Sequence, residues 1–163
     1  MLKQQLQKEL TEALKTGNQL KRLVLGTLMT AVKNKELAKR RQIGKTTNDT
    51  KELEEKSQLT EEEVLEVISS EVKKRKDSIE QFQKGGRHDL VEKEKLEMEI
   101  LAAYLPEQLS EEKIKNEVQH VIEELGATSP KEMGKVIGAV MAKLKGRADG
   151  TLVSKIVKEI LVK

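Results

Sequence analysis

The sequence predicts an all-helical protein of two bundles, a four-helix domain over residues 1–105 and a three-helix domain over residues 106–163. Apolar residues recur every three or four positions in seven segments, which is the period of a helix with one buried face. Charged residues make up 36% of the chain and prolines number only two, as expected for solvated helices. No segment alternates β-branched and polar residues, so no sheet is expected.

The first two expected helices are joined by a tight turn. Residues 2–16 carry an apolar stripe that ends at Gly17, and Asn18 can cap the helix that follows. The end of this second helix is strongly basic. Positive charge suits the C-terminal pole of a helix, and anion binding is the alternative interpretation. The cations concerned are Lys33, Lys35, Lys39, Arg40 and Arg41.

The third and fourth helices are expected to begin at capping boxes. Thr60 with Glu63 opens the third, and Asp89 with Glu92 opens the fourth. Glycines separate these two helices at residues 85–86. The fourth helix becomes more apolar toward its end, where a proline stops it.

A polar segment over residues 42–59 separates the second helix from the third. It lacks an apolar stripe and is longer than most connections between helices. We therefore expect a mobile loop, with at most a helical turn near residues 52–56.

Arg75 lies in the apolar stripe of the third helix, where a heptad would place an apolar residue. Its simplest partner is Glu71, one turn earlier, and Lys76 can pair with Glu80 in the same way. These residues are therefore expected to form pairs on the helix surface.

The C-terminal bundle begins and ends with clearly marked helices. Ser110 can cap the first, which ends at Gly126, and Asp149 can cap the last. Connections of about four residues are typical of a small bundle.

The middle helix of this bundle has a sequence signal at each of its two ends. Ser129 and Glu132 form a capping box around Pro130, and Gly146 supplies a left-handed end. A second face of this helix carries a ridge without side-chain bulk. Either a neighbouring helix packs closely on this ridge, or an RNA backbone approaches it. The ridge consists of Gly134, Gly138 and Ala142.

Charge is distributed unevenly along the chain, although the net charge is only +3. Residues 17–45 have eight basic and one acidic residue (net +7), and residues 126–163 have eight and three (net +5). Residues 46–125 between them have twelve basic and twenty-two acidic residues (net −10). An anionic partner would therefore choose one of the two basic segments.

Five segments match a known pattern: residues 73–82 (KKRKDSIEQF), 86–90 (GRHDL), 104–110 (YLPEQLS), 133–138 (MGKVIG) and 145–150 (KGRADG). Together they closely resemble the YqeY family, small bacterial proteins with a GatB/YqeY domain. The resemblance covers nearly the whole chain and implies an all-helical fold of two bundles. It also implies kinship with the tail domain of the B subunit of glutamine-dependent aminoacyl-tRNA amidotransferase, which contacts tRNA.

The resemblance implies a tRNA-binding site in the C-terminal bundle. Carried over by position, its residues include Lys135, Lys143, Lys145 and Arg147. Lys135 and Lys143, eight residues apart, are expected to share one face of the middle helix. With few phosphates contacted, binding should be modest and sensitive to salt.

The resemblance also brings the label of a carbon–nitrogen ligase with glutamine as amido donor. The chain has no cysteine nucleophile, no phosphate-binding loop and no serine in a strand–turn–helix elbow. His88 and His120 stand alone in the sequence. We therefore expect no catalytic residue, metal or cofactor, and any such activity only as part of a larger complex.

The remaining expectations concern partners and location. The acidic middle segment could instead meet a basic translation or tRNA-modifying protein, which makes an adaptor the alternative function. Phe82 and Tyr104 are the only aromatic residues, too few for stacking on single-stranded RNA. No apolar run is long enough to span a bilayer, and residues 1–5 lack a signal core. We expect a cytoplasmic protein without a membrane partner.

Overall fold

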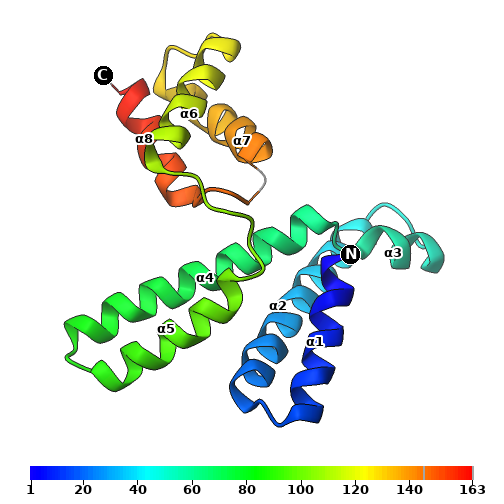
Figure 1. Cartoon of the computed structure of the whole chain (residues 1–163). Coiled ribbons are helices and arrows are strands. Elements are labelled where there is room, and N and C mark those ends of the chain that lie inside the picture. The colour runs from blue at the N-terminus through cyan, green and yellow to red at the C-terminus, as the bar shows by residue number, and fades with distance from the viewer. Residues whose placement is uncertain (145, 163) are drawn as a thin grey trace. The chain divides into compact units, whose positions relative to one another are not determined.

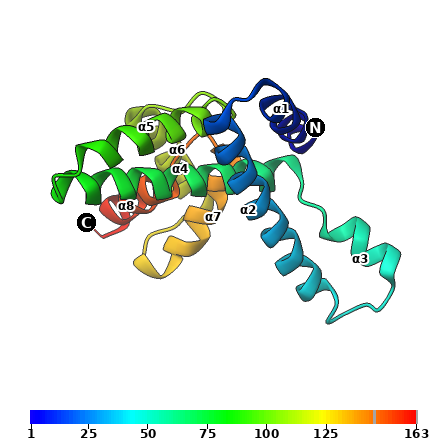
Figure 2. The ribbon, with the colours of Figure 1, turned by 90° about the horizontal axis from the view of Figure 1, so that it is seen from below.

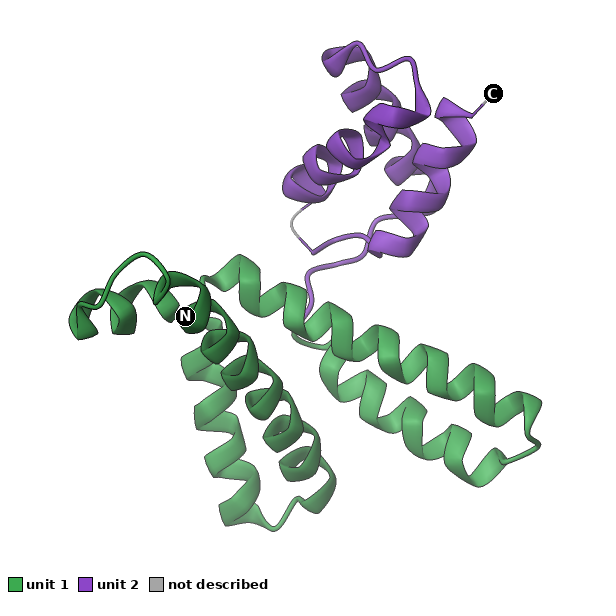
Figure 3. Ribbon diagram, turned by 180° about the vertical axis from the view of Figure 1, so that it is seen from behind, with its two compact units in different colours: residues 1–104 green, residues 105–163 purple. Residues whose placement is uncertain are grey.

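The computed structural model describes residues 1–144 and 146–162, and it confirms the all-helical class: no strand occurs among these residues. The chain divides into two compact units, residues 1–104 and residues 105–163 (Figure 3). None of the helices in the described ranges is both long enough and apolar enough to cross a membrane.

Unit 1 consists of two helical hairpins and one short extra helix (Figure 1). α1 pairs with α2 and α4 pairs with α5, and α2 packs against both helices of the second hairpin. The helices are α1 (Leu2–Thr16), α2 (Gln19–Ile43), α3 (Thr50–Ser57), α4 (Glu61–Lys84) and α5 (His88–Ala102). Their inward faces bury Leu6, Val24, Leu25, Leu28, Val32, Val64, Ile68, Val91 and Leu101 almost completely. This apolar core holds the two hairpins together.

Most helix ends in unit 1 follow local signals in the sequence. Gly17 adopts the left-handed conformation (φ 73°), and the Asn18 side chain accepts a hydrogen bond from the backbone N–H of Lys21 at 3.0 Å. The capping box of Thr60 and Glu63 is formed in both directions. These ends are predictable because cap and helix lie within a few residues of each other.

The predicted capping box at the start of α5 is wrong. α5 begins at His88, so Asp89 already lies in its first turn. The Asp89 carboxylate instead accepts two hydrogen bonds from the Arg87 guanidinium, at 3.0 and 2.9 Å. This pairing lowers the pKa of Asp89. The guanidinium two residues away is therefore the main partner of this carboxylate.

The expected loop between α2 and α4 contains α3, so unit 1 has five helices rather than the four predicted. Asp49 caps α3 by accepting from the backbone N–H of Lys51 at 2.9 Å. α3 packs against the C-terminal part of α2 (Figure 2), where Ser57 is buried. The helix has almost no apolar stripe of its own, so sequence periodicity could not reveal it.

Arg75 does not pair within its own helix, as the sequence had indicated. Its Nη2 lies 3.0 Å from Oε2 of Glu97 and its Nε lies 3.4 Å from Oε2 of Glu94, both on α5. Glu71 pairs with Lys74 instead, at 2.6 Å. The arginine therefore joins α4 to α5 at a position where an apolar residue would otherwise pack.

Unit 2 is a bundle of three helices, α6 (Glu111–Leu125), α7 (Met133–Leu144) and α8 (Gly150–Leu161). A 3-10 turn, η1 (Pro130–Glu132), leads into α7, so the box of Ser129 and Glu132 caps this turn. Glycines in the left-handed conformation end α6 and follow α7 (φ 61° and 78°). One closed core is shared by the three helices, with Ile114, Val118, Val121, Val136, Val140, Val153, Ile156 and Val157 at most 2% exposed.

Candidate nucleic-acid interface

The apolar stripe of α7 fixes which side of the helix is free. Val136, Val140 and Leu144 are buried, and Ile137 and Met141 pack beside them against α6 and α8. With this stripe held in the core of unit 2, the opposite side of α7 lies on the surface.

The small-residue ridge of α7 lies on that surface. Gly134, Gly138 and Ala142 are exposed. A Cβ atom added at either glycine would meet no other atom within 4 Å among the described residues. The ridge therefore does not serve close packing of α6 or α8, and the helix backbone is accessible along it.

Lys135 lies beside this ridge. Its side chain is exposed, and its charge contributes to the lowered pKa of Glu132. The largest causes of that shift are the backbone N–H groups of Thr128 and Ser129, which donate to the Glu132 carboxylate at 3.0 and 3.2 Å. Lys135 thus offers a solvated positive charge next to an open helix backbone.

Lys143 lies on another side of α7. At 100° per residue, eight residues leave two side chains about 80° apart, so the expectation that Lys135 and Lys143 share one face does not hold. Lys143 Nζ is 2.6 Å from Glu124 Oε2 and 3.6 Å from Glu117 Oε1, both on α6. The hydrogen bond to Glu124 raises the pKa of Lys143 and lowers that of Glu124. Two carboxylates therefore already balance this cation.

The turn after α7 is bound to the segment that opens unit 2. The backbone N–H of Leu109 donates to the carbonyl of Arg147 at 2.8 Å, and the Gln108 side chain donates to the carbonyl of Gly146 at 2.9 Å. Arg147 Nε donates in return to the carbonyl of Glu107 at 3.3 Å. Arg147 is exposed but has this structural contact, which joins two of the sequence motifs.

These bonds were missed in the sequence because the partners are almost forty residues apart. The available signal was that each motif contains a polar residue to which the sequence assigns no cap or core position, Gln108 in one and Arg147 in the other. Asp149, by contrast, caps α8 as expected, accepting from the backbone N–H of Thr151 at 2.8 Å. Lys145, the fourth predicted site residue, lies outside the described residues.

The charge of unit 2 is smaller than its basic C-terminal segment indicates. Residues 105–163 contain ten basic and nine acidic residues, a net charge of +1. Much of the negative charge belongs to α6, which supplies the partners of Lys143. The folded unit therefore brings an acidic helix against the basic one.

Comparison with known proteins decides the family. The family described as "Yqey-like protein" matches residues 3–161, nearly the whole chain. The chain belongs to this family. The match covers both units, in agreement with the motifs that lie in each of them.

Three curated relatives match over shorter stretches, two of them named "Altered inheritance of mitochondria protein 41, mitochondrial". One from Pyrenophora tritici-repentis is 34% identical over 105 residues, 63% of the chain and 58% of the relative. One from Lachancea thermotolerans is 32% identical over 127 residues, 77% and 60%. An uncharacterized protein of Schizosaccharomyces pombe is 47% identical over 51 residues, 31% and 42%.

These relatives are longer than the matched region, since the chain spans about 60% or less of their length. They are fungal, and two are mitochondrial by name, so they do not support the bacterial and cytoplasmic assignments expected from the sequence. Their names state no substrate or reaction.

Proposed function

We propose that the chain is a YqeY-like accessory protein whose C-terminal unit binds tRNA weakly, without catalysing a reaction by itself. The proposal includes kinship with the tail domain of the amidotransferase B subunit, which the sequence motifs indicate. Amide transfer from glutamine would then occur only in a larger complex, because the chain has no cysteine nucleophile and no phosphate-binding loop.

The open ridge of α7 is the observation that supports this proposal most. Gly134 and Gly138 face open space within the described structure, and exposed Lys135 lies next to them. A helix surface without side chains lets a nucleic-acid backbone come close, while a solvated lysine can contact its phosphates. If this ridge served only the fold, it would be expected to face a neighbouring helix.

The charges of unit 2 indicate weak binding. Lys143 is shared between two carboxylates, and Arg147 contacts a backbone carbonyl. Only a few phosphates would be neutralised, and each contributes about one unit to the slope of log affinity against log salt. We therefore expect a shallow slope. Because the affinity is low to begin with, binding is still expected to be lost at moderate salt.

The test measures tRNA binding by the full chain with fluorescence anisotropy at several salt concentrations. We expect saturable binding with a slope of about −2 to −4. Changing Lys135, Lys143 and Lys145 together to alanine should remove most of it. The matched control changes Lys73, Lys74 and Lys76 on α4, where acids crowd the surface, and should matter less. Loss of binding only in the α4 variant would place the RNA site in unit 1.

An adaptor role is the second candidate, and the acidic surface of α6 favours it. Glu111, Glu112 and Glu123 are exposed along this helix. A basic partner, such as a translation or tRNA-modifying protein, would meet negative charge there. Absence of any salt-dependent tRNA binding would replace the RNA proposal with this one.

A further inference from the structure

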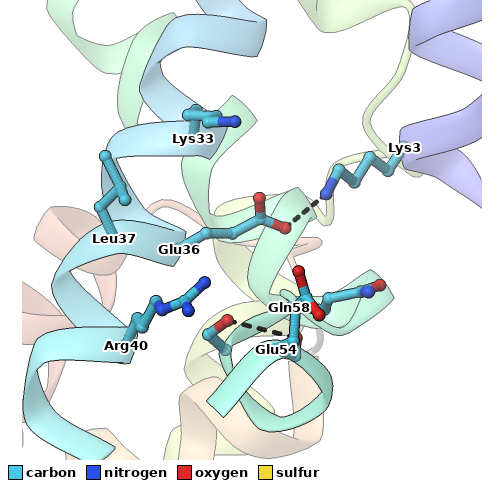
Figure 4. Close-up of a pocket in the computed structure, with 8 residues that line it drawn as sticks. Lys3, Lys33, Glu36, Leu37, Arg40, Glu54 and Gln58 are labelled. Atoms are coloured by element: carbon cyan, nitrogen blue, oxygen red, sulfur yellow. Dashed lines mark hydrogen bonds and ion pairs between the residues drawn. The ribbon is translucent and has the colours of Figure 1, made fainter. Parts of the chain in front are cut away.

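A pocket of about 250 Å³ lies in unit 1 among α1, α2 and α3 (Figure 4). It belongs to none of the sites considered above. α2 provides four positions on one stripe, α1 provides a lysine, and the end of α3 closes the remaining side. The lining residues are Lys3, Lys33, Glu36, Leu37, Arg40, Glu54, Ser57 and Gln58.

The acid at the centre of the α2 stripe is already neutralised. Glu36 Oε1 lies 2.5 Å from Lys3 Nζ and also accepts from the backbone N–H of Leu59 at 3.3 Å. Its side chain is only 16% exposed. Glu36 therefore presents little free negative charge to a ligand and holds Lys3 at the edge of the pocket.

Two cations of the pocket are not neutralised. The side chains of Lys33 and Arg40 make no hydrogen bond and no ion pair with any residue of the described ranges. They are seven residues apart, so they lie within about 20° of each other around α2. In Figure 4 the Arg40 side chain extends from α2 toward Glu54 on α3. Both positive charges thus lie at the same cavity.

Hydrogen-bond donors outnumber acceptors at this cavity. Lys3 uses one of its three N–H donors on Glu36, while Lys33 and Arg40 keep all of theirs. The backbone carbonyl of Gln58 already accepts a hydrogen bond from Lys39 Nζ at 3.2 Å. A group with several acceptor oxygens and more than one negative charge fits such a surface, and the planar fork of an arginine suits phosphate in particular.

We propose that this pocket binds a phosphate group, as inorganic phosphate or as a small phosphate monoester. Lys33 and Arg40 are its main ligands, and Lys3 adds a third donor without leaving Glu36. Leu37, which is 45% exposed beside them, offers apolar surface to the carbon skeleton of a monoester. Glu54 is the one acid of the lining with no partner for its carboxylate in the described residues, and its negative charge opposes the binding of an anion in the same pocket.

The experiment titrates the ¹⁵N-labelled full chain with inorganic phosphate at constant ionic strength, followed by NMR. We expect saturable shifts confined to amides near residues 33–40 and 54–58, with a dissociation constant in the millimolar range. A parallel titration uses ribose 5-phosphate. Tighter binding of this compound identifies a monoester as the ligand, and equal binding identifies the free ion.

Two variants with opposite expected effects test the assignment. Lys33→Ala with Arg40→Ala should weaken phosphate binding by about tenfold or more, because both unpaired charges are lost. Glu54→Gln should tighten it about threefold, because the opposing negative charge is removed while the shape of the side chain is kept. Tightening is a result that damage to the fold would not produce.

The matched control is Lys35→Ala with Arg41→Ala, which removes the same charge from α2 outside the pocket. Binding should stay within about twofold of the wild type after correction for salt. Equal weakening in the control, weakening by Glu54→Gln, or shifts that do not saturate would each overturn the proposal.

Discussion

The basic ends of α2 and α7 look alike in the sequence but differ in their surroundings. On α7, Lys143 is held between Glu124 and Glu117 of the neighbouring helix. On α2, Lys33 and Arg40 face a cavity and pair with no described residue. Charge along a segment therefore does not measure the charge that a ligand meets, because the helix packed beside it decides how much remains unpaired.

The same distinction orders the expected effects of removing a cation. A buried pair leaves an uncompensated charge behind when one partner is lost, and a surface pair leaves a charge that water can solvate. Removal of an unpaired cation leaves no partner charge behind. The stability of variants can therefore test the comparison, beginning with the largest effect.

Changing Arg75 to alanine should lower the free energy of unfolding by about 3–5 kcal/mol, since Glu97 is left buried and unpaired. The Glu97 side chain is only 7% exposed and its ion-pair partner is lost. Urea denaturation measures the effect. Adding Glu97→Gln to the variant should recover part of the loss by removing the stranded charge. A loss below about 1 kcal/mol would show that the pair behaves like one on the surface.

The next effect is a dependence of stability on pH through Glu9. Its carboxylate lies 2.7 Å from Lys21 Nζ and accepts a hydrogen bond from the Tyr104 hydroxyl at 2.5 Å. The hydrogen bond from Lys21, then that from Tyr104, lower the pKa of Glu9 from 4.5 to about 2. Burial, together with this same bond, raises the pKa of Tyr104.

Because the folded pKa of Glu9 is depressed, its contribution is fully present above pH 4.5 and is lost as the pH falls toward 2. We expect about 1–3 kcal/mol to be lost over this range. Tyr104→Phe should reduce that pH-dependent part, and Glu9→Gln should remove it. Chemical denaturation between pH 2 and pH 6 provides the measurement. An unchanged acid profile in Glu9→Gln would contradict this assignment.

A smaller effect is expected at Lys143. Its change to alanine should barely alter the midpoint of thermal unfolding, because both partners are on the surface. The pKa of Glu124, which the hydrogen bond from Lys143 lowers, should rise toward 4.5. An NMR titration of the Glu124 carboxyl group measures this shift. No change in that pKa would mean that the pair does not form in solution.

The smallest effect concerns Lys33 and Arg40, which are unpaired. Changing both to alanine should alter the free energy of unfolding by no more than about 0.5 kcal/mol. Urea denaturation without phosphate in the buffer provides the test. A clear loss of stability would reveal a partner for one of the two cations and weaken the comparison with α7.

Much of the fold could be predicted from the sequence because its signals are local. Apolar stripes predicted the cores of both units, and Gly17, Gly126 and Gly146 were predicted as helix ends. The structure gives all three a positive φ, a conformation that glycine adopts without the strain of a side chain. Asn18 and Thr60 cap their helices as expected, because each cap also lies within three residues of the N–H group that it binds.

The features that were missed depend on contacts between distant segments. α3 has little apolar periodicity and is held by packing on α2, and Arg75 found its partners on α5. In the candidate site, exposure of Lys135 followed from the stripe of α7, but the pairing of Lys143 and the bond from Arg147 to the carbonyl of Glu107 did not. Choice among several acidic partners is decided by helix packing, which periodicity alone does not give.

The most direct test of the RNA proposal adds bulk to the open ridge without removing any charge. A Cβ atom added at Gly138 has no atom of a neighbouring element within 4 Å in the described ranges, so Gly138→Gln should keep the fold and even stabilise α7 by about 0.5–1 kcal/mol. Gly26→Gln on α2 is the matched control, because this glycine also has no atom within 4 Å of an added Cβ.

The measurement is tRNA binding by both variants in the same anisotropy assay, with stability checked by circular dichroism. We predict that Gly138→Gln loses most of its affinity for tRNA, whereas Gly26→Gln binds as the wild type does. Undiminished binding by a folded Gly138→Gln variant would show that RNA does not approach the α7 backbone, which would contradict the central proposal.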